Sequence, residues 1–256
     1  NGIDFKIGTF DTIIGYEGAN AGSNPNYTRS YGYSIEPTQH TGVLGSYQVN
    51  KAIGFSLGIA NLWSSGIGGG VARSPRSESD KTYMGAVTLT APDDWGFVSG
   101  SALYLGVVDG FSTGFFGAAN DVTSYYIGLT LATPIKQLKV GAAYDYAHLH
   151  DNDFGPTGYA QTLGLYASVQ ATEKLSFHAR AEWLDVTDGV AGAAGVADEA
   201  IALTGTVQYD LWANVLTRLE LRWDTSVEGP RPYGGNLSSG GKKDEVLVAA
   251  NVIYKF

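Results

Sequence analysis

Apolar and polar residues alternate along one short segment of the chain after another, and this pattern constrains the fold more than any other feature. In 215–224, Val215, Thr217, Leu219, Leu221 and Trp223 form one series, and Arg218, Glu220, Arg222 and Asp224 form the other. The same division recurs in 53–60, 122–131 and 175–183. Because successive side chains of a β-strand point to opposite faces, these segments are predicted to be strands with one apolar face.

The last strand carries this pattern to the end of the chain. Alternate residues counted back from the end are Phe256, Tyr254, Val252, Ala250, Val248 and Val246. The other series contains Lys255, Asn251 and Glu245. A terminal strand of this kind is typical of the closing strand of a bacterial outer-membrane β-barrel, although a half-buried strand of a soluble sheet alternates in the same way.

Composition and charge exclude several classes of protein. The chain of 256 residues has no cysteine, which excludes disulfides and thiolate chemistry. It has no apolar run of the ~18 residues or more that a transmembrane helix needs. Its net charge of −9 argues against nucleic acid as a partner, because phosphate binding requires clustered Lys and Arg.

The connections between the predicted strands alternate between short and long, as in an up-and-down barrel. We predict an all-β fold in which residues 1–256 form one transmembrane antiparallel β-barrel. Twelve strands are expected at about 2–10, 41–49, 53–63, 81–91, 96–108, 121–132, 138–149, 158–171, 175–186, 198–209, 215–225 and 243–256. Long loops are expected at 64–80, 109–120, 150–157, 187–197 and 226–242. A β-propeller has a similar repeat of about 40 residues, but its strands are shorter.

Aromatic residues mark both ends of the apolar series. The predicted aromatic girdles comprise Tyr83, Tyr125, Tyr144, Tyr146, Trp183 and Trp223 near the long loops, and Tyr47, Phe177, Tyr209, Tyr254 and Phe256 near the short turns. Aromatic rings favour the headgroup level of a bilayer, whereas Leu, Ile, Val and Ala occupy the middle of the same faces. The apolar face is therefore expected to meet lipid.

The polar series is expected to line the interior of the barrel, together with charged residues of the long 11–40 segment. The predicted pore-lining residues are Lys6, Asp11, Glu17, Arg29, Lys139, Asp145, His178, Arg180, Glu182, Arg218, Glu220, Arg222 and Asp224. Opposed charges in a wet channel orient polar solutes. Alternatively, these residues pair with each other and only brace the wall.

An outer-membrane hydrolase is a remote alternative. Such an enzyme needs a serine that is polarised by an oriented histidine, and His178 lies beside Arg180 on the interior series without such a partner. The rim residues His148, His150, Asp151 and Asp153 match no metal-ligand spacing. We therefore predict no enzyme activity, no metal and no cofactor.

The first forty residues carry a resemblance to a known family. Residues 8–17 (GTFDTIIGYE), 24–30 (NPNYTRS) and 40–43 (HTGV) resemble the segment that joins a strand to a long loop in outer-membrane β-barrel porins of the beta-barrel porin 2 type. The resemblance implies a porin with a longer N-terminus and an intact barrel of up to about sixteen strands. The Asn1-Gly2 pair is similar to a hairpin turn that follows another strand.

These observations predict an outer-membrane porin that lets small hydrophilic solutes or ions diffuse passively. Residues 11–40 are expected to fold into the pore, and the overall acidity suggests a modest cation preference. The expected partners are the lipid bilayer, lipopolysaccharide and the solutes, with a homotrimer or a partner-protein complex as further possibilities. The alternative is a structural barrel that sheathes or anchors another protein, such as a cytochrome or a surface layer.

Overall fold

All strands of the protein belong to one antiparallel sheet. The computed structural model describes residues 2–65, 80–115, 118–150, 156–234 and 241–255. The strands are β1 (Ile3–Asp11), β2 (Gln39–Gln48), β3 (Ile53–Ala60), β4 (Thr82–Thr90), β5 (Ala102–Phe115), β6 (Ala118–Ala132), β7 (Leu138–Leu149), β8 (Gly158–Gln170), β9 (Leu175–Val186), β10 (Glu199–Trp212), β11 (Val215–Glu228) and β12 (Asp244–Tyr254). Each strand pairs with its neighbours in the sequence. The prediction of twelve up-and-down strands is confirmed.

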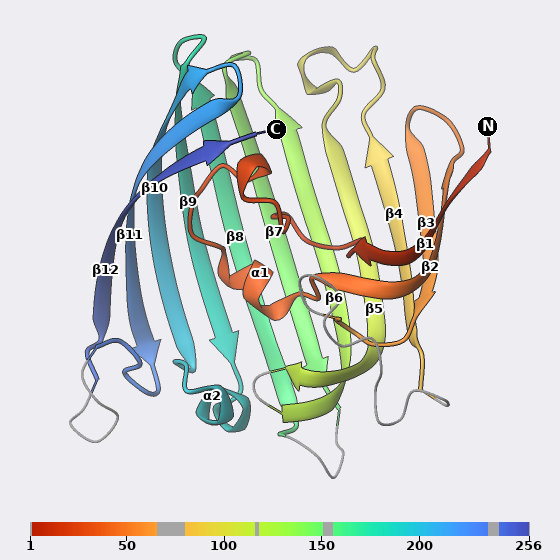
Figure 1. Ribbon diagram of the computed structural model, residues 1–256, viewed down its shortest axis with the longest axis vertical. Coiled ribbons are helices and arrows are strands. Elements are labelled where there is room, and N and C mark those ends of the chain that lie inside the picture. Colours follow the sequence, from red (N-terminus) through yellow and green to blue (C-terminus); the bar gives the residue numbers. More distant parts are fainter. Residues whose placement is uncertain (1, 66–79, 116–117, 151–155, 235–240, 256) are drawn as a thin grey trace.

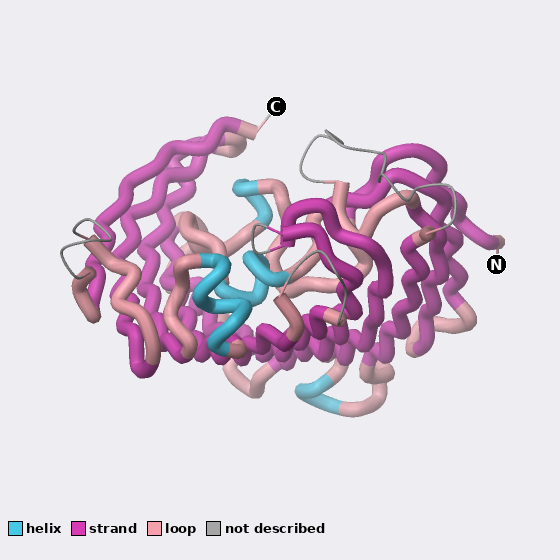
Figure 2. The backbone as a smooth tube through the Cα atoms, turned by 90° about the horizontal axis from the view of Figure 1, so that it is seen from below, coloured by secondary structure: helices cyan, strands magenta, loops and turns pink. Residues whose placement is uncertain are grey.

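The sheet curls into a deep trough (Figure 2). Strands β1 and β12 form its two edges, and within the described residues β1 pairs only with β2 and β12 only with β11. The connections β2–β3, β6–β7, β8–β9 and β10–β11 lie together at one end, the upper end in Figure 1. We call this the short-turn end, and the opposite end the loop end.

The two faces of the trough have inverted polarity relative to a soluble protein. The convex face exposes large apolar side chains, including Leu57 at 72% and Val252 at 71% of their surface. The concave face holds buried charged residues, including Arg180, Glu182 and Glu220. A continuous exposed apolar face of this extent marks an interaction surface, and an apolar band around a polar interior is the arrangement of a transmembrane barrel.

Two predicted boundaries were wrong. The strand expected at 96–108 begins only at Ala102, and η2 (Gly96–Val98) precedes it. Gly96 and Gly100 have φ values of +65° and +77°, which belong to the left-handed region rather than to a strand. The loop expected at 109–120 is instead largely a continuation of β5 and β6, whose pairing extends to Phe115 and Ala118.

Helices are few and short. Besides η2, the described residues contain η1 (Ala21–Ser23), α1 (Tyr31–Ile35) and α2 (Asp188–Ala194), and α2 occupies the predicted loop 187–197. In the described part of the chain, no helix has the length and apolar character needed to cross a membrane. Of the predicted loop 64–80, residues 66–79 lie outside the described residues.

Candidate functional site

The connection between β1 and β2 lies inside the trough, and we call its residues 12–38 the inner segment. Figures 1 and 2 show it against the concave face, with α1 near the middle of the sheet. Its two ends are joined where the amide of Thr12 donates to the carbonyl of Thr38 at 3.0 Å. Long connections normally run over a protein surface, so an inward course requires specific attachments.

Local hydrogen bonds give the inner segment its shape. The side chain of Asn20 accepts from the amide of Gly22 at the start of η1, and Ser30 caps α1 by accepting from the amide of Tyr33 at 3.0 Å. The Asn24 side chain bridges both backbone groups of Gly18. Asn and Ser side chains favour such caps and turns because they satisfy free backbone groups.

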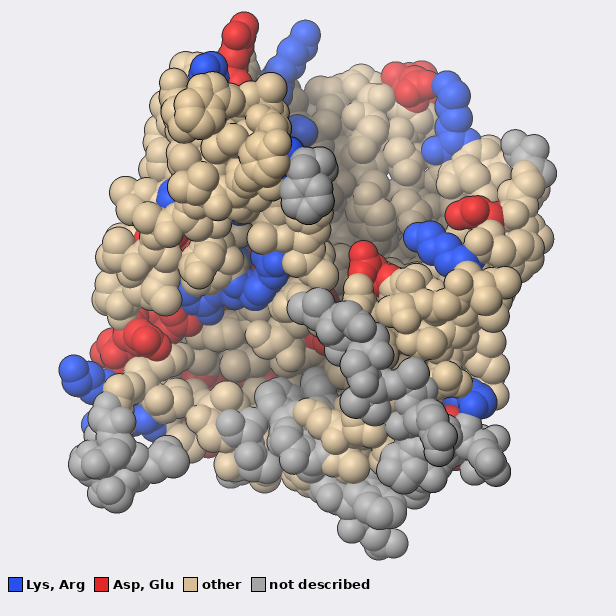
Figure 3. All heavy atoms as spheres, in the orientation of Figure 1, with Lys and Arg blue, Asp and Glu red and all other residues tan. Residues whose placement is uncertain are grey.

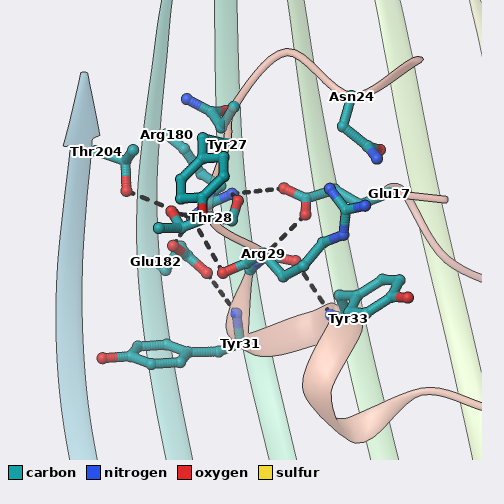
Figure 4. Close-up of polar contacts among 12 residues, drawn as sticks. Glu17, Asn24, Tyr27, Thr28, Arg29, Tyr31, Tyr33, Arg180, Glu182 and Thr204 are labelled. Carbon is teal, nitrogen blue, oxygen red and sulfur yellow. Dashed lines mark hydrogen bonds and ion pairs between the residues drawn. The ribbon is translucent and has the colours of Figure 1, made fainter. Parts of the chain in front are cut away.

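Arg180 on β9 is the centre of the attachment (Figure 4). It forms an ion pair of 2.6 Å with Glu17 of the inner segment and another of 2.6 Å with Glu182 of its own strand. It also donates to the carbonyl oxygens of Thr28 at 2.8 Å and Arg29 at 3.2 Å. Only 2% of Arg180 is exposed, so its charge is offset by protein groups rather than by water.

Arg222 and Asp224 on β11 continue this attachment toward the loop end. Arg222 donates to the carbonyl of Arg29 at 2.7 Å and pairs with Asp224 at 2.7 Å. The Tyr31 hydroxyl donates to Asp224 at 2.7 Å, and the Tyr31 amide donates to Glu182. The start of α1 is therefore held by carboxylates from two strands.

Arg218 and Glu220 bind the backbone of the inner segment nearer the short-turn end. Glu220 accepts from the amides of Tyr27 at 2.6 Å and Thr28 at 2.8 Å. Arg218 donates to the carbonyl oxygens of Ala21 at 3.1 Å and Asn24 at 2.5 Å. Because alternate residues of a strand share a face, the polar residues 218, 220, 222 and 224 of β11 all point toward the inner segment and bind it over much of its length.

A contact between two carboxyl groups joins the C-terminal end of the inner segment to β7. The carboxyl group of Glu36 is buried beside that of Asp145. A Cβ atom on Gly15 would clash with Glu36, and one on Gly32 would clash with Asp145. Two carboxyl groups can share a hydrogen bond only when one of them carries a proton, so this contact depends on protonation.

Burial and the neighbouring charge of Asp145 raise the pKa of Glu36 well above its ordinary value. Protonated Glu36 therefore stabilises the fold at low pH, and this contribution is lost as pH rises from about 4.3 through the folded pKa. We expect Glu36→Gln to unfold like the wild type at pH 4 but at a higher temperature than the wild type at pH 8.

Thermal unfolding of the two proteins in detergent, followed by circular dichroism across this pH range, measures the difference. Asp94→Asn serves as a control, since Asp94 is an exposed carboxylate in a turn and should not alter the pH profile. Equal loss of stability with rising pH in wild type and Glu36→Gln would show that the pair does not hold the inner segment.

The structure brings most of the predicted pore-lining residues together. Glu17, Arg180, Glu182, Arg218, Glu220, Arg222 and Asp224 belong to the attachment network, and Asp145 contacts α1. Lys139 and His178 lie nearer the short-turn end. Arg29 stacks over the ring of Tyr33 at 5.1 Å. That these residues line an open pore stays a prediction.

Two predicted positions lie apart from this network. Lys6 is exposed near the β1 edge of the trough. Asp11 was expected to face the interior, but its side chain points to the other face of β1 from the buried Phe10. There its carboxylate accepts a hydrogen bond from the side chain of Gln39 at 2.9 Å. The reason is strand alternation, because Asp11 shares its face with Ile7 and Thr9.

The predicted aromatic girdle residues share the convex face wherever the structure describes them. Tyr83, Tyr125, Trp223, Tyr47, Phe177, Tyr209 and Tyr254 are exposed there. Tyr144, Tyr146 and Trp183 are partly exposed, and Phe256 lies outside the described residues. Contact with a bilayer headgroup region remains a prediction for this set.

The sequence reasoning missed three groups of the inner segment. Glu36, Tyr31 and Asn26 all bind concave-face side chains, and Asn26 donates to Thr206 at 2.8 Å. The charge of Glu36, next to the apolar Ile35 and Pro37, was the one available signal for burial. At the rim, His150 bonds to Thr123 at 2.7 Å, and Asp151 and Asp153 lie outside the described residues.

Comparison with known proteins shows which protein family the sequence matches. The sequence profile of the beta-barrel porin-2 (OmpL-like) family matches residues 1–256. No curated protein sequence matches the chain.

Solved structures share the fold at low sequence identity. OmpT, an outer membrane protein of Vibrio cholerae, has a TM-score of 0.61 and 14% identity, with 98% of this chain and 76% of that chain covered. The anion-selective porin from Comamonas acidovorans has a TM-score of 0.59 and 13% identity, over 86% of this chain and 60% of that one. The outer membrane channel DcaP of Acinetobacter baumannii has a TM-score of 0.56 and 9% identity, over 86% and 64%. The chain thus spans less than two thirds of two of these proteins.

Proposed function

Because the chain belongs to the beta-barrel porin-2 (OmpL-like) family, we propose that it forms a channel for the passive diffusion of small hydrophilic solutes. It is a β-barrel protein of the bacterial outer membrane, and the lipid bilayer surrounds its convex face. A polar interior inside an apolar band suits the passage of water-soluble molecules, since charged groups across the lumen make entry of apolar solutes costly.

The observation that carries the proposal is the inward course of the inner segment. The buried ion pair of Arg180 with Glu17 and the hydrogen bonds from Arg180 and Arg222 to backbone carbonyl groups hold it against the wall of the trough. A segment fixed in this way narrows the interior without filling it, because a cavity of about 750 Å³ remains beside residues 22–25. We propose that the inner segment sets the largest solute that passes.

The same observation weighs against the structural alternative. A barrel that sheathes a cytochrome or another protein needs a wide interior, whereas the inner segment occupies part of this one (Figure 2). Catalysis has no support in the family or the fold, which are those of channels. Contact with lipopolysaccharide and assembly into trimers, as in many porins, complete the proposal.

Swelling of liposomes in sugar solutions tests the proposed function. Full-length protein reconstituted in liposomes should admit a pentose rapidly and a trisaccharide slowly. Replacement of residues 18–35 by a short Gly-Ser linker should raise the rate for the trisaccharide more than the rate for the pentose. Liposomes with heat-denatured protein serve as the control. Equal size dependence with and without residues 18–35 would contradict the proposed role of the inner segment.

A further inference from the structure

A cavity at the short-turn end of the trough lies between the inner segment and the sheet. We call it the vestibule, and its volume is about 750 Å³. Residues 22–25 of the inner segment form one side, and β6 to β11 with the turns at 99–100 and 136–137 form the other. Figure 3 shows that the molecule is hollowed at this end. Under the proposed channel function, this space lies on the route of a solute along the concave face.

The ionisable side chains that line the vestibule are basic apart from tyrosine hydroxyls. Lys136, Lys139, His178 and Arg218 line it, and none of the lining residues is Asp or Glu. Two carboxylates outside the lining act on these groups: Glu220 and Asp210 act on Arg218, and Asp210 also acts on His178. Asp210 in turn accepts from Gln208 at 3.0 Å. The vestibule therefore combines four basic groups in its lining with two carboxylates at its border.

Arg218 differs from the other two arginines of the concave face. Arg180 and Arg222 each form ion pairs with carboxylates. Within the described residues Arg218 has no carboxylate within ion-pair distance, and it donates only to the carbonyl oxygens of Ala21 and Asn24 and to Gln208. A guanidinium has five N–H donors, so two remain available on a cation that faces the vestibule.

Neutral hydrogen-bonding groups complete the wall. The two ring nitrogens of His178 lie 2.8 Å from the Ser168 hydroxyl and 3.1 Å from the Ser176 hydroxyl. All three residues line the vestibule. A hydroxyl group can rotate, and an imidazole ring can change its tautomer, so that either group donates a hydrogen bond to an acceptor in the vestibule. Cations that are combined with such donors suit an oxyanion.

The acidity of the whole chain does not cancel this local field. Several carboxylates, such as Asp121 and Glu199, lie at the loop end of their strands. A strand of twelve residues spans roughly 40 Å, and the Debye length at physiological salt is only about 8 Å. An ion in the vestibule therefore senses Lys139 and Arg218 far more strongly than it senses the distant rim.

We propose that the vestibule binds small oxyanionic solutes, namely carboxylates or phosphates, and that it makes the channel anion-selective. This inference rests on the proposed channel function. It reverses the cation preference expected from the net charge of −9, because groups that line the path outweigh charges that salt screens. Lys139 is the specificity-determining residue that is best suited to a test, since it is exposed to the vestibule and takes no part in the attachment of the inner segment.

The test is the reversal potential of full-length protein in a planar bilayer under a gradient of potassium chloride. The wild type should show a preference for anions. Lys139→Glu should lower the anion-to-cation permeability ratio by about fivefold, which is the effect of the interaction between two unit charges about 4 Å apart in water. Lys51→Glu is the matched control, because Lys51 undergoes the same charge change in an exposed turn outside the vestibule. It should leave the ratio unchanged.

Substitution of potassium acetate and then potassium phosphate for the chloride separates the two classes of oxyanion, and the anion that permeates best relative to chloride identifies the preferred one. Cation preference in the wild type would overturn the inference while leaving the channel function intact. Equal shifts in Lys139→Glu and Lys51→Glu would overturn it as well. Absence of any conductance would overturn the channel function and the inference with it.

Discussion

Arg180→Ala is expected to destabilise the protein by about 3–5 kcal/mol, the cost of removing one partner from a buried ion pair. The change leaves Glu17 buried without its cation, leaves Glu182 with only the longer ion pair to Arg222, and removes two hydrogen bonds to carbonyl groups of the inner segment. The inner segment then loses its central attachment. We therefore also expect a larger and less steady single-channel conductance than in the wild type.

Arg180→Lys separates charge from geometry. Lysine retains the charge but lacks the planar fork that reaches several acceptors at once, so its stability should fall between those of wild type and Arg180→Ala. Arg231→Ala is the control, because Arg231 is exposed beyond the end of β11. Chemical unfolding in detergent and bilayer recordings measure the two effects. Wild-type conductance in a destabilised Arg180→Ala protein would mean that the inner segment does not narrow the path.

Leu221→Arg is expected to impair insertion into a bilayer, because the change places a charge in the middle of the convex face. Leu221 is 55% exposed on β11, next to Trp223. An arginine on the lipid face of a barrel costs about 2–4 kcal/mol at the bilayer midplane and about 0–1 kcal/mol near the interfaces. The yield of folded protein in liposomes should therefore fall strongly.

Thr217→Arg provides the matched control for depth. Thr217 shares the convex face of β11 and pairs with the girdle residue Tyr209 near the short-turn end. The same charge at this level should change the yield little. Protease protection after reconstitution measures the folded fraction. Equal losses for the two variants would contradict the placement of the apolar face in lipid.

The strands could be predicted closely from the sequence because membrane strands repeat one simple rule. The bounds of β7 and β9 agree with the predicted ranges 138–149 and 175–186. Their alternation reflects contact with lipid on one side and polar groups on the other, so it needs no knowledge of partners. The extension of β5 and β6 was missed because residues 109–121 are rich in Gly, Asp and Asn, whose local preference for loops is overridden by pairing between the two strands.

The attachment of the inner segment was less accessible to sequence reasoning. Arg180, Glu182, Glu220 and Arg222 could be assigned to one face by their spacing, but their partners in the inner segment include backbone groups of residues 27–31. Backbone groups carry no signature in a sequence. The pairing of Glu17 with Arg180 spans 163 positions, and only the curvature of the sheet brings the two together.

The conductance of the purified full-length protein in a planar bilayer tests the central claim most directly. The account predicts stable, discrete open steps in symmetric salt, because it proposes that ions pass along the polar concave face and through its vestibule. Insertion of well-folded protein without any conductance would contradict it, since the inner segment would then close the interior rather than narrow it.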